Sequence, residues 1–258
     1  MASVVGVVNQ KGGVGKTTTT VNVAASLCAA ELSVLVVDCD PQGNATTGLG
    51  GNKHKASSHL YDLLMNDADI DQCVTKISDT LSLIESTPHL SGVEIEFAQV
   101  DGWAHTLKER LAEIKDNYDV VLIDSPPSLG MLTVNILVSS DYILVPLQCE
   151  FYALEGLSQL WKTLSMTQKG LNPHLDVLAI VLTMFEDNSD LNNQVADDVR
   201  SHFKELVCQT VIPRDARMSE SPSFSKPVLW YGSDSKGSLA YIKLAHELIE
   251  RLKLPIHV

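Results

Sequence analysis

The sequence predicts an α/β fold in which helices flank a doubly wound, mostly parallel sheet. Short runs rich in Val, Ile and Leu show no polar alternation, which is typical of strands covered on both faces. Segments with apolar residues at helical spacing separate these runs, and repeated strand–helix–strand units build a parallel sheet. The chain has 258 residues, 45% hydrophobic and 20% charged, an ordinary globular composition that excludes disorder and collagen-like repeats.

The elements follow one another in a regular order. Strands are expected at residues 3–8, 34–38, 119–124, 142–146 and 176–182. Helices are expected at residues 16–30, 103–115, 154–168, 191–203 and 238–252, the last with Leu239, Ile242, Leu248 and Leu252 facing inward. The two longest stretches without a periodic pattern, residues 43–57 and 213–238, are expected to be loops. No Pro-, Gly- or Ser-rich linker divides the chain, so we expect one domain over residues 1–258.

Charge and cysteine content exclude several classes of protein. Nineteen basic and 32 acidic residues give a net charge of −13, which argues against diffuse affinity for nucleic acid but leaves a local basic patch open. The five cysteines are scattered and unpaired in pattern, as expected for reduced thiols in a cytosol. No His or Cys spacing indicates a transition-metal site, and no apolar run is long enough to span a membrane. The start of the chain is typical of a strand rather than a signal peptide.

The most informative segment follows the first expected strand and leads into the first expected helix. It reads Asn9-Gln10-Lys11-Gly12-Gly13-Val14-Gly15-Lys16-Thr17-Thr18. Its glycines permit backbone angles that turn successive N–H groups inward around phosphate oxygens, and the helix adds its positive end. We expect Lys16 to contact the β- and γ-phosphates and Thr17 to ligate Mg²⁺. The strict P-loop pattern would have Gly where Gln10 stands, and Lys11 is an additional lysine.

This segment resembles the deviant Walker A motif of the ParA/MinD superfamily of P-loop ATPases. Residues 34–44 are similar to the A′ motif of that superfamily, and residues 121–128 are similar to its Walker B segment. Residues 146–156 and 212–223 resemble the ParA/Soj branch specifically. The five blocks occur in the family's order and cover nearly the whole chain.

The resemblance implies a role for each matching residue, with ATP and Mg²⁺ as cofactors. Lys11 is the signature lysine, which reaches the phosphates of a partner subunit across a nucleotide sandwich. Asp40 positions the attacking water or its Mg²⁺ partners, Asp124 holds Mg²⁺ through water, and Asp38 is the alternative, structural carboxylate. The implied catalytic residues are thus Lys11, Lys16 and Asp40, and the metal-binding ones are Thr17, Asp40 and Asp124. Nucleotide binding is implied for Lys11, Gly12, Gly13, Val14, Gly15, Lys16, Thr17 and Thr18. Pro213, Arg214 and Asp215 match the adenine-side loop, where binding and plain loop structure both stay open.

The same resemblance implies a segregation ATPase. Such a protein forms a homodimer with ATP, binds DNA non-specifically, is stimulated by a ParB-type partner, and is cytoplasmic and nucleoid-associated. The chain begins directly at its first strand, so we expect no N-terminal helix-turn-helix extension. One departure concerns DNA: Asn188 stands where relatives carry arginine, and residues 183–230 hold five basic against eight acidic residues. The candidate DNA contacts are Arg217, Lys226, Lys243, Arg251 and Lys253.

Two alternatives use the same fold. A MinD-like membrane switch would need a basic amphipathic C-terminal helix, but Pro255 stops the last helix and Glu247 and Glu250 offset its basic residues. We therefore expect no membrane binding. A metabolic enzyme would be either a nitrogenase-iron-protein-like reductase, whose cysteine pair Cys149 and Cys208 do not match, or a small-molecule ligase, which would require an acceptor substrate for ATP turnover.

Overall fold

The computed structural model describes residues 2–51 and 58–255. Within these residues the strands form one eight-stranded sheet in the order β3-β4-β2-β5-β1-β6-β7-β8. Neighbouring strands are parallel except for the antiparallel β3–β4 pair. The strands are β1 (Ser3–Val7), β2 (Val34–Asp38), β3 (Val74–Lys76), β4 (Leu81–Ile84), β5 (Val120–Asp124), β6 (Tyr142–Gln148), β7 (Asp176–Phe185) and β8 (Val207–Pro213). The predicted doubly wound, mostly parallel α/β fold is confirmed.

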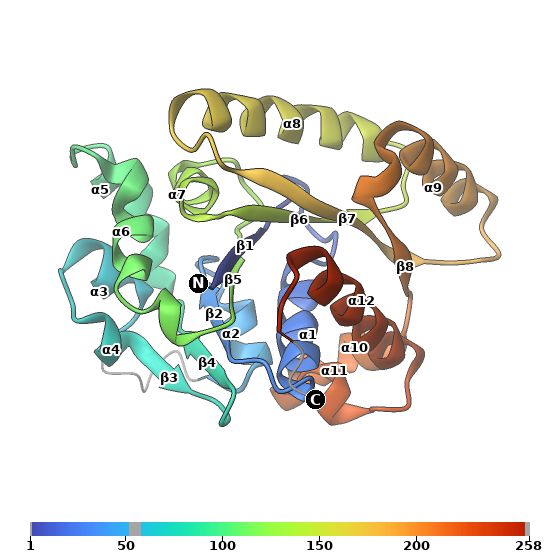
Figure 1. Ribbon diagram of the computed structural model, residues 1–258, viewed down its shortest axis with the longest axis horizontal. Coiled ribbons are helices and arrows are strands. Elements are labelled where there is room, and N and C mark those ends of the chain that lie inside the picture. Colours follow the sequence, from blue (N-terminus) through green and yellow to red (C-terminus); the bar gives the residue numbers. More distant parts are fainter. Residues whose placement is uncertain (1, 52–57, 256–258) are drawn as a thin grey trace.

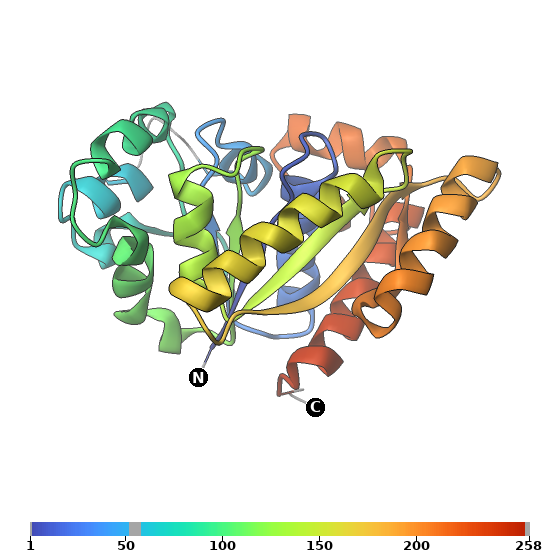
Figure 2. The same ribbon diagram turned by 90° about the horizontal axis from the view of Figure 1, so that it is seen from above.

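Helices cover both faces of the sheet (Figure 1). One face carries α1 (Lys16–Ala29), α2 (Asn44–Gly48), α10 (Ala216–Glu220), α11 (Val228–Tyr231) and α12 (Lys236–Leu252). The other carries α3 (Leu60–Met65), α4 (Ile70–Cys73), α5 (Val93–Phe97), α6 (Thr106–Ala112), α7 (Met131–Ser139), α8 (Ala153–Gly170) and α9 (Asp190–Phe203). Seen from above, α8 runs across β6 and β7 (Figure 2).

Each central strand contributes to two hydrophobic cores. Val4 belongs to the core under α3–α9, whereas its neighbour Val5 belongs to the core under α1 and α12. Leu35 and Val36 divide in the same way. Since successive side chains point to opposite faces and both faces are covered, these strands are apolar at every position, which produces the uninterrupted runs in the sequence.

The expected strands are all present, but β3, β4 and β8 were not predicted. Where one helix was expected at residues 103–115, the structure has the shorter helix α6. A 3₁₀ turn precedes it at Trp103–His105, and another follows it at Lys115–Asn117. The expected loop at residues 213–238 contains α10, the 3₁₀ turn Ser221–Phe224 and α11. The expected loop at residues 43–57 begins with α2, and residues 52–57 of it lie outside the described residues. These short elements carry too few apolar residues to show a period.

The inward face of α12 differs from the expected one. Leu239 and Ile242 are 50% and 41% exposed, so the prediction that they face the core is wrong. Leu248 is buried and Leu252 packs partly against the core, as predicted. The rest of the core face consists of Tyr241, Leu244 and two alanines, and the Tyr241 hydroxyl lies 3.2 Å from Thr19 Oγ1 on α1. The helix ends at Leu252, ahead of Pro255, as predicted. Across the described residues, no helix is long and apolar enough to cross a membrane.

Candidate functional site

The loop between β1 and α1 forms a cradle at the carboxyl edge of the sheet. Gly13 and Gly15 have φ angles of +76° and +88°, in the left-handed region that favours glycine. Gly15 is also the N-cap of α1 and leaves this 14-residue helix without a side-chain cap. The N–H groups of its first turn, together with the positive end of its dipole, are thus available to an anion. The strand–loop–helix context predicted for residues 9–18 is confirmed.

The two lysines of the loop face different environments. Lys16 is 6% exposed, and its Nζ donates to the carbonyl oxygen of Lys11 at 3.0 Å. Burial lowers the pKa of Lys16, an effect that the charges of Asp124 and Asp40 oppose. Lys11 has a side chain that is 40% exposed and forms an ion pair with Glu150 of the same chain. Because such exposed pairs are worth about 0–1 kcal/mol, Lys11 leaves this partner at little cost.

Two buried carboxylates lie opposite each other on neighbouring strands, β2 and β5. Asp124 accepts hydrogen bonds from Thr17 Oγ1 at 2.8 Å and Thr20 Oγ1 at 2.9 Å. Asp38 accepts from the backbone N–H and the hydroxyl of Thr46, both at 2.7 Å. Burial raises the pKa of Asp124 to about 8, with a further contribution from the charge of Asp38, and it raises the pKa of Asp38 to about 6. Asp38 therefore holds α2 in place, the structural role expected for it.

Asp40 lies with the phosphate loop in one cavity of about 320 Å³. This carboxylate is 7% exposed, and its Oδ1 accepts a hydrogen bond from the N–H of Gln42 at 2.9 Å. The cavity is also lined by residues 12, 13 and 15–18, and by Gln42, Asn44, Pro127 and Met184. The structure thus brings the predicted Asp40 and the predicted loop together. Asp124 is not among the lining residues and lies behind Thr17.

These groups fit a magnesium-bound triphosphate. The glycine cradle, the uncapped helix and Lys16 supply donors for phosphate oxygens. The hydroxyl of Thr17, backed by the carboxylate of Asp124, supplies the hard oxygen ligands that Mg²⁺ prefers. The bond from Lys16 Nζ to the Lys11 carbonyl satisfies a donor that phosphate oxygens can equally satisfy.

A second cavity of about 230 Å³ adjoins the first through Gly15, Thr18 and Met184. Two of the predicted adenine-side residues, Arg214 and Asp215, line it. Arg214 is paired with Glu186 at 2.5 Å. Both carboxylate oxygens of Asp215 accept backbone N–H groups, from Arg217 and Gly237, so this side chain fixes the starts of α10 and α12.

Pro213, the third predicted adenine-side residue, lies elsewhere. It lines a separate cavity of about 620 Å³ between β8 and α12, rather than the one beside the phosphate loop.

Sequence reasoning missed two residues that shape the cleft. Met184 lines both nucleotide-side cavities and has a φ angle of +51°, uncommon for a residue other than glycine. Thr183 donates from Oγ1 to the carbonyl oxygen of Val14 at 2.8 Å and so ties the end of β7 to the loop. Both residues end an apolar run, where the sequence indicates only core packing.

Comparison with known proteins decides the family. Residues 2–177 match a family model described as an AAA domain. The chain is 48% identical over 251 residues to the chromosome partitioning protein ParA of Caulobacter vibrioides, covering 96% of this chain and 94% of that protein. It is 45% identical over 249 residues to the sporulation initiation inhibitor protein Soj of Bacillus subtilis, covering 96% and 98%. The chain belongs to the ParA/Soj family. The resemblance that the motifs carried is thereby confirmed.

A solved structure similar to this member of the ParA/Soj family shows ligands. It is cobyrinic acid a,c-diamide synthase of Mycobacterium smegmatis with bound ADP and magnesium, at a TM-score of 0.85 and 33% identity over the full length of both chains. ADP and magnesium are the ligands of that protein. They match the chemistry of the donor set around Lys16, Thr17 and Asp124 described above.

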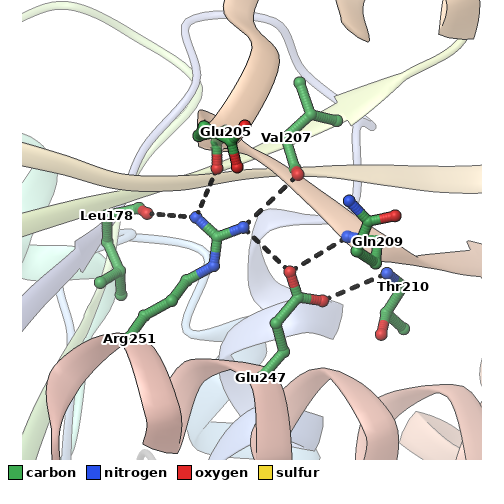
Figure 3. Close-up of polar contacts among 7 residues, drawn as sticks. All are labelled: Leu178, Glu205, Val207, Gln209, Thr210, Glu247 and Arg251. Atoms are coloured by element: carbon green, nitrogen blue, oxygen red, sulfur yellow. Dashed lines mark hydrogen bonds and ion pairs between the residues drawn. The ribbon is translucent and has the colours of Figure 1, made fainter.

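The basic residues suggested for DNA contact divide into two groups. Arg251 donates to the carbonyl oxygens of Leu178, Glu205 and Val207 and to the carboxylate of Glu247 (Figure 3). Arg217 is paired with Asp234. These two arginines are thus occupied by protein partners. The other three, Lys226, Lys243 and Lys253, are exposed, and Lys243 lines the cavity between β8 and α12. Lys236, which was not among the suggested residues, is also exposed and lines the same cavity.

The raised pKa of Asp124 predicts a pH-dependent stability of the ligand-free protein. In the folded protein the carboxyl group of Asp124 keeps its proton up to about pH 8, whereas in the unfolded chain it loses that proton near pH 4. The stability of the folded protein therefore falls as the pH rises between these values. One such proton is worth at most about 1.4 kcal/mol per pH unit. In magnesium-free buffer, the melting temperature should fall less steeply from pH 6 to 8 in Asp124→Asn than in the wild type. Asp79→Asn, at an exposed carboxylate, should keep the wild-type slope, and equal slopes in all three proteins would contradict the assignment.

Proposed function

We propose that this protein is an ATP-dependent dimerising switch that hydrolyses MgATP and acts in chromosome or plasmid segregation. In this proposal the ATP-bound form is a homodimer that binds DNA non-specifically. A ParB-type partner stimulates hydrolysis, which is slow without it, and ADP returns the protein to monomers. Membership of the ParA/Soj family supports the biological role, and the geometry of the phosphate loop supports the switch.

The observation that carries the proposal is the difference in burial and contacts between Lys16 and Lys11. Lys16 is buried and directed to the loop of its own chain, where it can serve only phosphates bound there. Lys11 is half exposed and held by a single weak ion pair at the surface. A lysine so placed is free to serve a phosphate presented by a second copy of the chain. Two MgATP-loaded faces would otherwise repel each other, since each carries a high negative charge.

The assigned residues then account for a γ-phosphate switch. Lys16 and the loop N–H groups hold the phosphates, and Lys11 of the opposite subunit adds positive charge where negative charge develops. Asp40, in the same cavity as the loop, orients the attacking water. When the terminal phosphate leaves, the attraction on Lys11 is lost, and the subunits separate.

Sedimentation velocity tests the proposal directly. The protein should sediment as a monomer with MgADP and as a dimer with a non-hydrolysable ATP analogue and Mg²⁺. A monomer under both conditions would overturn the switch. In gel-shift assays non-specific duplex DNA should bind only the dimer, and raising the salt concentration should weaken that binding.

The exposed lysines of α12 support the DNA-binding part of the proposal. Unlike Arg217 and Arg251, Lys236 and Lys243 form no ion pair with any residue that the structure describes. Both are exposed and line the cavity between β8 and α12. We expect Lys236→Ala and Lys243→Ala each to weaken DNA binding and to reduce the slope of log affinity against log salt by about one unit. Lys169→Ala, an equal charge change on α8 across the sheet, should leave the slope unchanged (Figure 1). An unchanged slope in both α12 variants would place the DNA contacts elsewhere.

Two further assays separate the alternative functions. Sedimentation with liposomes, with and without ATP, tests a MinD-like membrane switch, and ATP-dependent pelleting would favour it. ATP turnover in the absence of any carboxylate or amine acceptor tests a small-molecule ligase, the class suggested by the name of the M. smegmatis structure. Turnover without an acceptor removes the ligase.

A further inference from the structure

Gln10 stands where the strict P-loop pattern has glycine, and its side chain does not line the phosphate cavity. Its amide Nε2 donates instead to the carbonyl oxygen of Gly156 at 3.2 Å and to Oε1 of Gln159 at 3.0 Å. Both acceptors lie in the first two turns of α8, about 150 residues further along the chain. A glycine at position 10 could make neither bond.

The residues on either side of Gln10 contact the same segment. Asn9 donates from Nδ2 to the carbonyl oxygen of Pro146 near the end of β6 at 2.8 Å, and its Oδ1 accepts the N–H of Lys11 at 3.0 Å. Lys11 pairs with Glu150 in the turn between β6 and α8. Three consecutive loop residues are therefore attached to residues 146–159.

The contacts of the loop with residues 146–159 end at Lys11, and Gly12 and Gly13 follow. Gly12 and Gly13 are exposed, and a side chain at Gly13 would meet nothing within 4 Å. Glycine loses more conformational freedom on ordering than any other residue. A further glycine at position 10 would place glycine on both sides of Lys11. The hydrogen bonds of the Gln10 side chain to α8 instead restrain the backbone directly before Lys11.

We propose that Gln10 is a positioning residue for Lys11: by its bonds to α8, it fixes the backbone from which Lys11 reaches the nucleotide of the partner subunit. The inference rests on the proposed function, because it concerns the formation of the ATP-bound dimer. It separates two tasks within one loop. The glycines and Lys16 bind the phosphates of the subunit's own nucleotide, whereas Gln10 determines how well the loop serves the second subunit.

The first test is Gln10→Gly, which creates the strict P-loop pattern. The variant should bind MgADP as a monomer within about twofold of the wild type, measured by titration of a fluorescent ADP analogue. With a non-hydrolysable ATP analogue and Mg²⁺, its dimer dissociation constant from sedimentation should rise about five- to tenfold, as expected for the loss of hydrogen bonds and of preorganisation. A residue that served only folding would not separate these two affinities.

Changes at Gln159 test the contact from the other side, where the side chain is exposed and substitution leaves the core intact. Gln159→Glu keeps an acceptor for Gln10 and should dimerise as the wild type does. Gln159→Lys replaces the acceptor with a donor but leaves the bond from Gln10 to the Gly156 carbonyl oxygen, so it should weaken the dimer in the same direction as Gln10→Gly but by less. The dimer of the double variant Gln10→Gly/Gln159→Lys should be no weaker than that of Gln10→Gly alone, because Gln10→Gly already removes the bond that Gln159→Lys disrupts.

The outcomes distinguish the inference from the function on which it rests. If the wild type stays monomeric with the ATP analogue, the proposed switch and the inference both fail. If the wild type dimerises and Gln10→Gly dimerises equally well, only the inference fails. A large loss of MgADP affinity in Gln10→Gly would also overturn it, since Gln10 would then belong to the phosphate cradle itself.

Discussion

Replacing Lys11 by alanine should abolish the ATP-dependent dimer while leaving nucleotide binding to the monomer nearly unchanged. The bond from Lys16 to residue 11 uses the backbone carbonyl, which alanine retains. In the proposed dimer, the variant loses a charge that meets negative phosphate in a desolvated interface, a contact whose removal typically costs about 2–5 kcal/mol or more. Sedimentation with the non-hydrolysable ATP analogue should therefore show a dimer dissociation constant raised at least about 30-fold.

Glu150→Gln is the matched variant, and it should change the affinity of the dimer in the opposite direction. It removes the carboxylate that holds Lys11 in its own chain and leaves Lys11 intact. Because that ion pair is about two-fifths exposed on both sides, its loss should tighten the dimer only modestly, about two- to fivefold. Dimerisation of Lys11→Ala at the wild-type level would contradict the role given to this lysine, whatever Glu150→Gln does.

Removing the carboxylate of Asp40 should stop hydrolysis without preventing dimerisation. A positioned general base or water-orienting group contributes about 10²–10⁴-fold to a rate, so phosphate release by Asp40→Ala should fall by at least about 100-fold. The ATP-bound dimer should persist, now with MgATP itself, and sedimentation should detect it.

Asp40→Asn separates the charge from the local structure. The asparagine retains an oxygen that can accept the N–H of Gln42, as Oδ1 does now, while the negative charge is lost. If the charge is what matters, Asp40→Asn should be as inactive as Asp40→Ala. Hydrolysis by both variants within threefold of the wild-type rate would rule out Asp40 as the residue that orients the water.

The central part of the fold and the phosphate site could be predicted from the sequence because each rests on local patterns. Strands covered on both faces produce continuous apolar runs, and the loop between residues 9 and 18 carries glycines and lysines at fixed spacing. The roles of Asp40 and Asp124 came from the resemblance, and each residue follows or ends an apolar run that was expected to be a strand. The structure places both of them beside the loop.

What the sequence did not predict depends on contacts between distant segments. Three features bring together residues that are far apart in the chain. They are the position of Met184 between two cavities, the ion pair of Lys11 with Glu150, and the hydrogen bonds of Gln10 to α8. Arg251 illustrates the same limit, because a basic residue near the end of a surface helix is typical of solvent exposure. Its guanidinium instead satisfies three carbonyl oxygens. The inward face of α12 was misassigned because Tyr241 and two alanines, rather than Leu239 and Ile242, fill the space beside α1.

The carboxylate of Glu247 on α12 also affects how readily this protein aggregates through the edge of its sheet. It accepts the N–H groups of Gln209 and Thr210 at 3.0 and 3.2 Å, on β8, the last strand of the sheet order (Figure 3). Terminal strands with vacant donors are templates on which a foreign chain can add a strand and begin to aggregate. By occupying two backbone donors of β8 from within the same chain, α12 makes this edge of the sheet a poorer template for an added strand.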